Sequence, residues 1–455
     1  MVIVMRRFLA TATRYGFVTV LLASSGIAHC EEDAFSKWAA AHAVPLTTVE
    51  PSEDLSDLLP LKSMIGKARV VALGEPMHGA HESMAFRNRL IRFLVEQMGF
   101  TAVALESGFT ESSNARSFVE GGDGDAETAA QTGLPWLSQY LETGQLLQWM
   151  RDYNTAAASR GHRKIGLYGI DIPAGGRLSG PRLTIDSALK FLSRADPTTA
   201  QKIRDSLSGD LPGTESQELG PLSAVTQMEF DTSIQAIAKA MQKSRKSLIA
   251  GSSDEEYRWA LHNLDAARQI AKCLPITPST PPPGTSVRLW ARLEACRDAA
   301  MAENVQWALK NEGRQGRLLV FAHLGHVMNS KEDGRRMAEV REKPPLMGFH
   351  LRREYGKDLY IIAMATATTS GGLPTAKPVE TDSIESALAG LGLPLMFLDV
   401  RVARQNKEAF AWLSTPRGID ANVSAHILIT PSTAVDAFFF VNTLTPAILS
   451  SDKAP

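Results

Sequence analysis

The chain has 455 residues, of which 44% are hydrophobic, and its formal net charge is -1 at pH 7. This length and composition suit one or two globular domains with a large core. A near-neutral charge without a run of basic residues argues against nucleic acid as a main partner. No internal stretch approaches the length of a membrane span.

Residues 1–28 have the features of a secretory signal peptide. Arg6 and Arg7 precede an apolar run that ends in small residues, which is the order of regions in such a peptide. We expect cleavage near Ala28 or Cys30, giving a periplasmic or secreted protein without membrane contact. An uncleaved membrane anchor is the alternative.

We expect residues 29–60 to form a lead-in and residues 61–455 to form one α/β domain. Its predicted strands are short apolar runs, most of them separated by helical segments. They lie at 68–74, 101–106, 164–171, 317–323, 358–364, 394–400, 426–430 and 436–442. Continuous apolar runs are typical of parallel strands, which are buried on both faces. The predicted fold is a mostly parallel central sheet flanked by helices, and its first strand–helix–strand unit implies a parallel pair.

A large helical insertion is predicted at residues 181–314, which are helical in pattern and more polar than their surroundings. We expect it to pack over the carboxyl rim of the sheet. Cys273 and Cys296 lie within it. They pair if the compartment is oxidising; two buried thiols are the alternative, because sequence does not give their separation.

One predicted helix, at residues 84–98, carries an arginine where an apolar residue is expected. On a helical wheel, Arg89, Arg92 and Glu96 lie opposite the apolar arc, as solvated residues do, whereas Arg87 lies in its middle. We therefore predict that Arg87 faces the core and that Gly99 ends the helix.

A core-facing guanidinium keeps its proton and so needs a carboxylate partner. Glu75 and Glu106, each near the end of a predicted strand, are the candidates for Arg87. Ligands in open α/β sheets bind outside the carboxyl ends of the strands. Asp171 also ends a predicted strand, and the sequence supports a role in the site and a role as a cap equally.

Histidines follow two of the predicted strands. His78 comes three residues after Glu75, and His323 and His326 come just past a later strand. Imidazole suits general-base work near neutral pH, and an adjacent carboxylate fixes its tautomer. The predicted catalytic set is therefore His78, Glu75, Arg87, Glu106, His323 and His326.

Other chemistries fit less well. The same carboxylates and histidines are plausible zinc or iron ligands, but Arg87 repels a cation and no His-Glu-x-x-His spacing occurs. There is no Gly-x-Ser-x-Gly elbow, no phosphate-cradling glycine loop, and no cysteine near the predicted rim. We expect hydrolysis by activated water without a metal or other cofactor. A metal-dependent enzyme and a non-catalytic protein that binds a haem-like or macrocyclic ligand are the alternatives.

These motifs resemble the erythromycin esterase family. The resemblance begins with the Glu75-Pro-Met-His78 turn, Arg87 and Glu106. It extends through later motifs that cover about residues 60–450, at 146–154, 168–171, 322–329, 347–352 and 438–446.

The resemblance implies a metal-independent hydrolase that opens a macrolide lactone, with antibiotic resistance as its role and His78 as the general base. The predicted site residues all match the family's residue types. The helical insertion shows no recognisable match, so the reaction class carries over better than the substrate. We expect a small-molecule ester or lactone as partner; the oligomeric state is not indicated.

Overall fold

The computed structural model describes residues 34–172, 181–207, 224–273, 285–331, 342–374, 382–420 and 426–452. The predicted signal peptide, Cys30 and parts of the predicted insertion, at 208–223 and 274–284, lie outside these residues. Within the described residues, no helix combines the length and the apolar character needed to cross a lipid bilayer.

An eight-stranded sheet forms the centre of the molecule. Its strands are β1 (Val44–Pro45), β2 (Val70–Glu75), β3 (Ala102–Gly108), β4 (Gly166–Asp171), β5 (Leu318–His323), β6 (Leu359–Thr369), β7 (Leu395–Asp399) and β10 (Ala437–Leu444). Their spatial order is β1-β7-β10-β6-β2-β5-β3-β4. The strands from β10 to β4 are mutually parallel, whereas β7 is antiparallel to both β10 and β1. The predicted mostly parallel sheet is confirmed.

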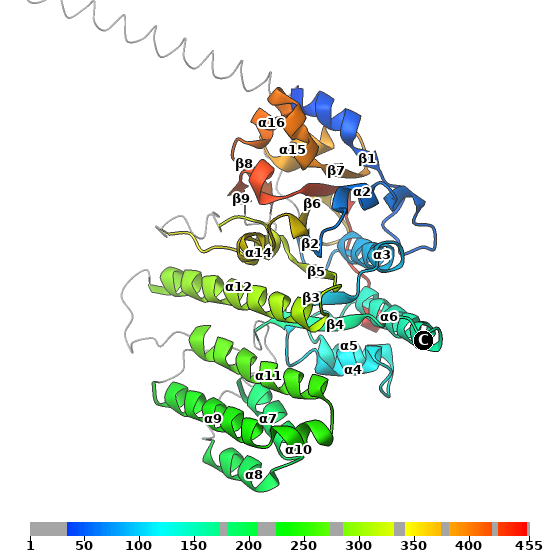
Figure 1. The fold of residues 1–455 in the computed structure, drawn as a ribbon. Coiled ribbons are helices and arrows are strands. Elements are labelled where there is room, and N and C mark those ends of the chain that lie inside the picture. Colours follow the sequence, from blue (N-terminus) through cyan, green and yellow to red (C-terminus); the bar gives the residue numbers. More distant parts are fainter. Residues whose placement is uncertain are drawn as a thin grey trace, which may run out of the picture.

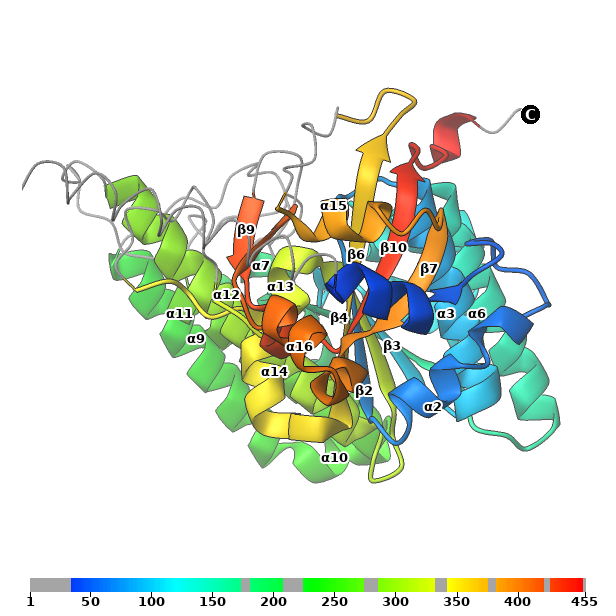
Figure 2. The ribbon, with the colours of Figure 1, turned by 90° about the horizontal axis from the view of Figure 1, so that it is seen from above.

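Helices cover both faces of this sheet (Figures 1 and 2). One face packs against α2 (Leu61–Ile65), α3 (His81–Met98), α4 (Ser113–Val119), α5 (Ala126–Gly133) and α6 (Leu141–Ser159). The other packs against residues 34–42, α12 (Thr285–Asn311), α13 (Leu324–Val327), α14 (Met347–Tyr355), α15 (Ile384–Ala389), α16 (Lys407–Leu413) and α17 (Pro431–Ala434). The period-two alternation of a strand explains the two cores, because Val71 and Leu73 face α3 while Val70 and Ala72 face α12.

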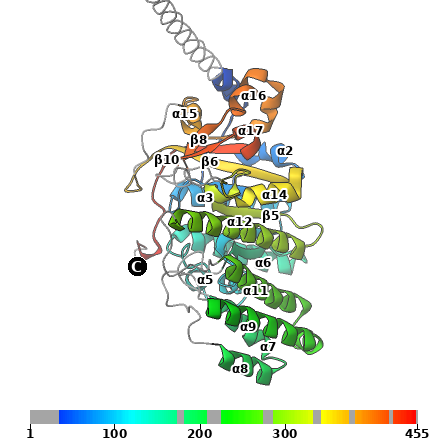
Figure 3. The same ribbon diagram turned by 90° about the vertical axis from the view of Figure 1, so that its left-hand side faces the viewer.

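The predicted insertion is a stack of helices beyond the edge strand β4. It comprises α7 (Pro181–Leu192), α8 (Pro197–Ser206), α9 (Ala224–Lys243), α10 (Arg245–Ala250), α11 (Asp254–Cys273) and α12. Figure 3 shows α11, α9 and α8 lying successively farther from the sheet than α12. The outer helices share an apolar core of their own, and α12 joins them to β4.

Three expectations need correction. Strand β5 lies between β2 and β3, so the first strand–helix–strand unit is parallel but its strands are not neighbours. The strand predicted near His426 is β9 (His426–Ile429), which pairs with β8 (Arg417–Asp420) in a separate small sheet. Arg89 is 1% exposed rather than solvated, because the segment before α2 folds over it and Asp57 pairs with its guanidinium at 2.6 Å.

The prediction for the end of α3 is confirmed. Gly99 adopts a left-handed conformation with φ 69°, which glycine reaches without a Cβ penalty. The amides of Gly99 and Phe100 donate to the carbonyls of Val95 and Leu94, so the last turn of the helix is satisfied.

Candidate active site

The candidate site lies where β2, β3, β4 and β5 end. Glu75 and His323 are register partners at the carboxyl ends of the adjacent strands β2 and β5. Gly74 permits this arrangement, because a Cβ there would collide with Leu324 and Val327 in the turn that follows His323. The predicted meeting of residues far apart in sequence is therefore found at this rim.

His78 lies in the turn between β2 and α3, with 36% of its side chain exposed. Its Nδ1 lies 2.7 Å from Oε1 of the buried Glu75, which leaves Nε2 free to accept a proton. Burial lowers the pKa of His78, but the hydrogen bond and charge of Glu75 and the charge of Glu106 outweigh it, so the pKa lies above 6.5. Trp136 packs edge-on against the ring at 4.4 Å between centroids.

His323 is a neutral neighbour of His78, with 5.0 Å between ring centroids. Burial, and then the charge of His78, lower the pKa of His323 to about 3. Its Nδ1 accepts from the amide of Gly325 at 3.2 Å, so the ring proton is on Nε2. That atom is buried and has no hydrogen-bond partner of normal geometry among the described residues, although the Pro76 backbone is near enough to raise the pKa of the ring. An imidazole in this state is a donor available to a substrate oxygen.

Glu106 holds several rim elements together. The strand β3 has an irregular register between Leu105 and Gly108, and such irregularities redirect side chains. Oε2 of Glu106 accepts from the backbone amide of His323 at 2.7 Å, and Oε1 pairs with Arg297 at 2.9 Å. Burial raises the pKa of Glu106, but His326 and Arg297 lower it well below 4.5. Glu106 is therefore a fixed negative charge.

Arg297, which the sequence analysis missed, is the central cation of the rim. It comes from α12 and binds Asp171 through Nε at 2.9 Å and through Nη2 at 2.7 Å. Despite burial, Asp171 and Glu106 raise the pKa of Arg297 well above its ordinary value. Asp171 is thus part of the rim cluster. A helical wheel for α12 contained the signal, because Arg297 lies on the apolar stripe of Leu293 and Met301.

His326 faces away from His78 and into this cluster. Its Nδ1 lies 2.8 Å from Oδ1 of Asp298, and its Nε2 lies 3.4 Å from Oε1 of Glu106. Burial lowers the pKa of His326, but the charges of Asp298 and Glu106 raise it well above 6.5. Nε2 also lies 3.1 Å from Nη1 of Arg297 and would accept from it if the ring were neutral. The two carboxylates favour the protonated ring, which donates to both of them.

A divalent cation could be held by Glu294, Asp298 and His326, whose ligand atoms lie within 4.8 Å of one another. The guanidinium of Arg297 lies among the same groups, 3.7 Å from Glu294. It therefore already supplies positive charge where such an ion would bind.

Arg87 is buried as predicted, with 0% exposure, but its predicted partners are wrong. Among the described residues it forms no ion pair with Glu75 or Glu106, because His78 engages Glu75 and Arg297 engages Glu106. Arg87 donates from Nε to Asn88 at 3.0 Å and lies over the ring of Phe321. Burial lowers the pKa of Arg87 to about 10, against the charge of Glu75.

A segment near the C-terminus, residues 445–450, fastens the His78 turn. The amide of Ala447 donates to the carbonyl of Gly79, and the carbonyl of Thr445 accepts from the amide of His81. The same segment bonds to Gln139 and Leu141 at the start of α6. Residues 445–450 therefore join the turn that carries His78 to the segment that follows Trp136.

His81, the fourth histidine at the two rim turns, lies outside the cluster. Its ring bridges Glu142 at 2.7 Å and Glu50 at 2.8 Å. The hydrogen bond to Glu142 raises the pKa of His81 to about 9. Burial opposes this rise, and Glu50 adds to it. His81 is thus an ionic clamp between α3, α6 and the N-terminal lead-in.

Comparison with known proteins identifies the family. The sequence profile of the erythromycin esterase family matches residues 95–444, which is more than half of the chain. The chain belongs to the erythromycin esterase family. Membership supports a hydrolase.

Relatives in this family extend over much of the chain. Erythromycin esterase type II of Escherichia coli is 27% identical over 303 residues, covering 65% of this chain and 69% of the relative. The YbfO protein of Bacillus subtilis (strain 168) is 24% identical over 87% of both chains.

Solved structures share the fold. A Bacillus cereus protein is 25% identical with a TM-score of 0.75, covering 92% of this chain and 99% of that one. An erythromycin esterase EreC variant, described as being in its open conformation, is 18% identical with a TM-score of 0.61, covering 89% and 98%.

We expect the His81 clamp to make stability depend on pH. Because its pKa rises from 6.5 to about 9 on folding, its stabilisation is complete below pH 6.5 and is lost as pH rises through about 9. In wild type, this loss should cost about 1–2 kcal/mol, since Glu50 is exposed and screened. Thermal melts of wild type and His81→Gln at pH 6 and pH 10 measure it. Equal pH dependence in both proteins would contradict the clamp; His162→Ala, at an exposed histidine, is the control.

Proposed function

We propose that this protein is an exported, metal-independent hydrolase that opens an ester or macrolactone with water activated by His78. The observation that carries the proposal is the pairing of a basic, partly exposed His78 with a buried neutral His323 beside it. A general base and a neutral donor on adjoining turns are what ester hydrolysis without a covalent nucleophile requires.

His78 is suited to take the proton. Glu75 accepts from Nδ1, so the lone pair is on Nε2 and Glu75 stabilises the imidazolium that forms. Water loses its proton to Nε2 as its oxygen attacks the ester carbonyl carbon. The same proton then passes from His78 to the departing alkoxide, which leaves an acid and an alcohol.

His323 is suited to stabilise the oxyanion. Its Nε2–H has no hydrogen-bond partner of normal geometry among the described residues, so it can turn to the developing negative oxygen, with the nearby Pro76 backbone as the competing acceptor. The ring of His323 lies directly against the partly exposed His78, whereas Arg87 has no exposed surface, which favours His323 over Arg87 for this role. Glu106 and Arg297 act through His323 and His326 rather than on the substrate.

The charge of the rim supports metal-independent chemistry. Arg297 and the protonated His326 already pair with Glu106, Asp171 and Asp298 at this edge of the sheet, so two positive charges stand among these three carboxylates. We propose a small-molecule ester or lactone as the substrate class, a periplasmic or secreted location after removal of residues 1–28, and an antibiotic-resistance role if that lactone is a macrolide.

His78→Ala should lose about 10²–10⁴-fold in kcat while retaining the fold, because a positioned general base is removed. The assay incubates the protein with a panel of macrolide lactones and simple aryl esters and detects, by mass spectrometry, products heavier by one water. His162→Ala is the matched control, because His162 is exposed and precedes the amino end of β4, whereas the rim lies at the carboxyl end of that strand. Turnover by His78→Ala at wild-type rates would contradict the assignment.

The same assay separates the alternatives. No turnover of any panel member by wild type, together with retained ligand, favours a binding protein. Activity that is lost on chelation and restored by zinc would contradict the metal-independent reaction.

Glu75→Gln should move the acid limb of the kcat/KM profile to lower pH. The charge of Glu75 raises the pKa of His78 above 6.5, and hydrolysis needs the unprotonated ring, so wild-type activity rises through a pKa above that value. Without the carboxylate the ring loses its proton at lower pH, although the plateau falls. Profiles of Glu75→Gln and of the exposed control Glu408→Gln test this; an unmoved limb would contradict the pairing.

His323→Phe should lower kcat by about 10²–10³-fold, the usual effect of removing one oxyanion donor. His323→Gln keeps an N–H donor and should lose less. Because Nδ1 of His323 also accepts from Gly325, melting temperatures are measured for both variants. Equal losses of kcat in two folded variants would argue against a hydrogen-bonding role.

A further inference from the structure

The helix α12 is fastened to the rest of the protein in two different ways along its length. In its C-terminal third, Asn304 donates to the carbonyl of Ile170 in β4 and accepts from His262 or Gln269 of α11. Two turns earlier, the helix carries Glu294, Arg297 and Asp298 into the rim. Asn304 therefore fixes one part of α12, and the site depends on another.

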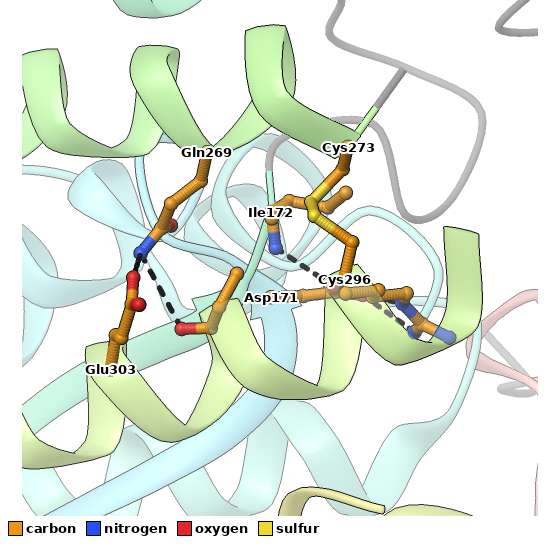
Figure 4. The surroundings of a disulfide bond; sticks show 8 residues. Asp171, Ile172, Gln269, Cys273, Cys296 and Glu303 are labelled. Carbon is orange, nitrogen blue, oxygen red and sulfur yellow. Dashed lines mark hydrogen bonds and ion pairs between the residues drawn. A yellow bond between two sulfur atoms is a disulfide. The ribbon is translucent and has the colours of Figure 1, made fainter. Parts of the chain in front are cut away.

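A disulfide fastens the part that carries the site residues. Cys273, the last residue of α11, is bonded to Cys296, with 5.3 Å between their Cα atoms. Figure 4 shows the bond joining the two helices close to Asp171. Of the two predicted alternatives, the paired state is the one observed. The residue that follows Cys296 is Arg297, so the bond is next to the central cation of the rim.

Arg297 needs such a fixed position. Its guanidinium must reach Asp171 and Glu106 together, at 2.7 and 2.9 Å, and both carboxylates are buried. An arginine fork loses its bidentate geometry with a small displacement of its backbone. If Arg297 moves, Glu106 loses its counter-charge, and Glu106 also holds the backbone of His323.

We propose that the Cys273–Cys296 disulfide positions Arg297, so that the site is fully assembled only in the oxidised protein. A dithiol reductant converts the disulfide to two thiols and is itself oxidised to a disulfide. The start of α12 then loses its covalent link to α11, and hydrolysis slows. This inference rests on the proposed hydrolase function for its activity readout, but not for its structural one.

The test compares oxidised and reduced full-length protein in wild type and in Arg297→Met, Arg297→Lys and Cys273→Ser/Cys296→Ser. We expect reduction and the double serine variant each to lower kcat about tenfold in the presence of Arg297, with a smaller change in KM. If the disulfide acts through Arg297, the effects on kcat of losing the disulfide and of substituting Arg297 are not additive. Reduction should then have no further effect in Arg297→Met, and an intermediate one in Arg297→Lys, which keeps the charge without the fork.

Hydrogen exchange of the peptide covering residues 285–297 gives a second measurement. Faster exchange of this peptide after reduction, with unchanged exchange around Asn304, supports the proposal. This holds even if wild type hydrolyses no tested ester, because the absence of hydrolysis would count only against the proposed function. Unchanged exchange after complete reduction would overturn the proposal, whether or not the protein is active. Equal slowing by reduction in wild type and in a folded Arg297→Met would also overturn it.

Discussion

The structure depends on the pairing of several charges buried at one edge of a parallel sheet. An isolated charge in a protein interior is strongly unfavourable, so Glu106, Asp171 and Asp298 require cations. Arg297 and His326 supply them. Because Arg297 belongs to α12, this electrostatic requirement also fixes where the helical insertion docks. The contacts of Arg297 with the rim carboxylates therefore both support the site and attach the helical insertion to the sheet.

The two histidines nearest to each other show how surroundings set protonation. His78 is partly exposed and bonded to Glu75, which raises its pKa. His323 lies deeper, next to a positive neighbour and a backbone donor, and its pKa falls to about 3. Two identical side chains 5.0 Å apart between centroids thereby differ in protonation, and the proposed mechanism uses one as the base and the other as the hydrogen-bond donor.

Sequence patterns predicted the parallel sheet, the insertion and the position of most rim residues, because strand ends and apolar runs are local features. Partners across the fold were harder to predict. Arg87 was expected to pair with Glu75 and Glu106. The partner of a buried carboxylate, however, depends on which cations the fold places beside it, and Arg297, which pairs with Glu106, lies on a helix more than one hundred residues away in the sequence. Arg89 was misplaced because the segment that covers it precedes the helix and has no periodic pattern.

The helices of the insertion differ in what they touch. Those from α7 to α10 share a core with α11 that does not include the rim residues, whereas one face of α12 supports the site directly. Mutations in the outer helices can therefore accumulate and reshape the surroundings of the insertion without disturbing the charges of the rim. Changes on the sheet-facing side of α12 alter both at once. We therefore expect substitutions in the outer helices to be tolerated more readily than substitutions on the sheet-facing side of α12.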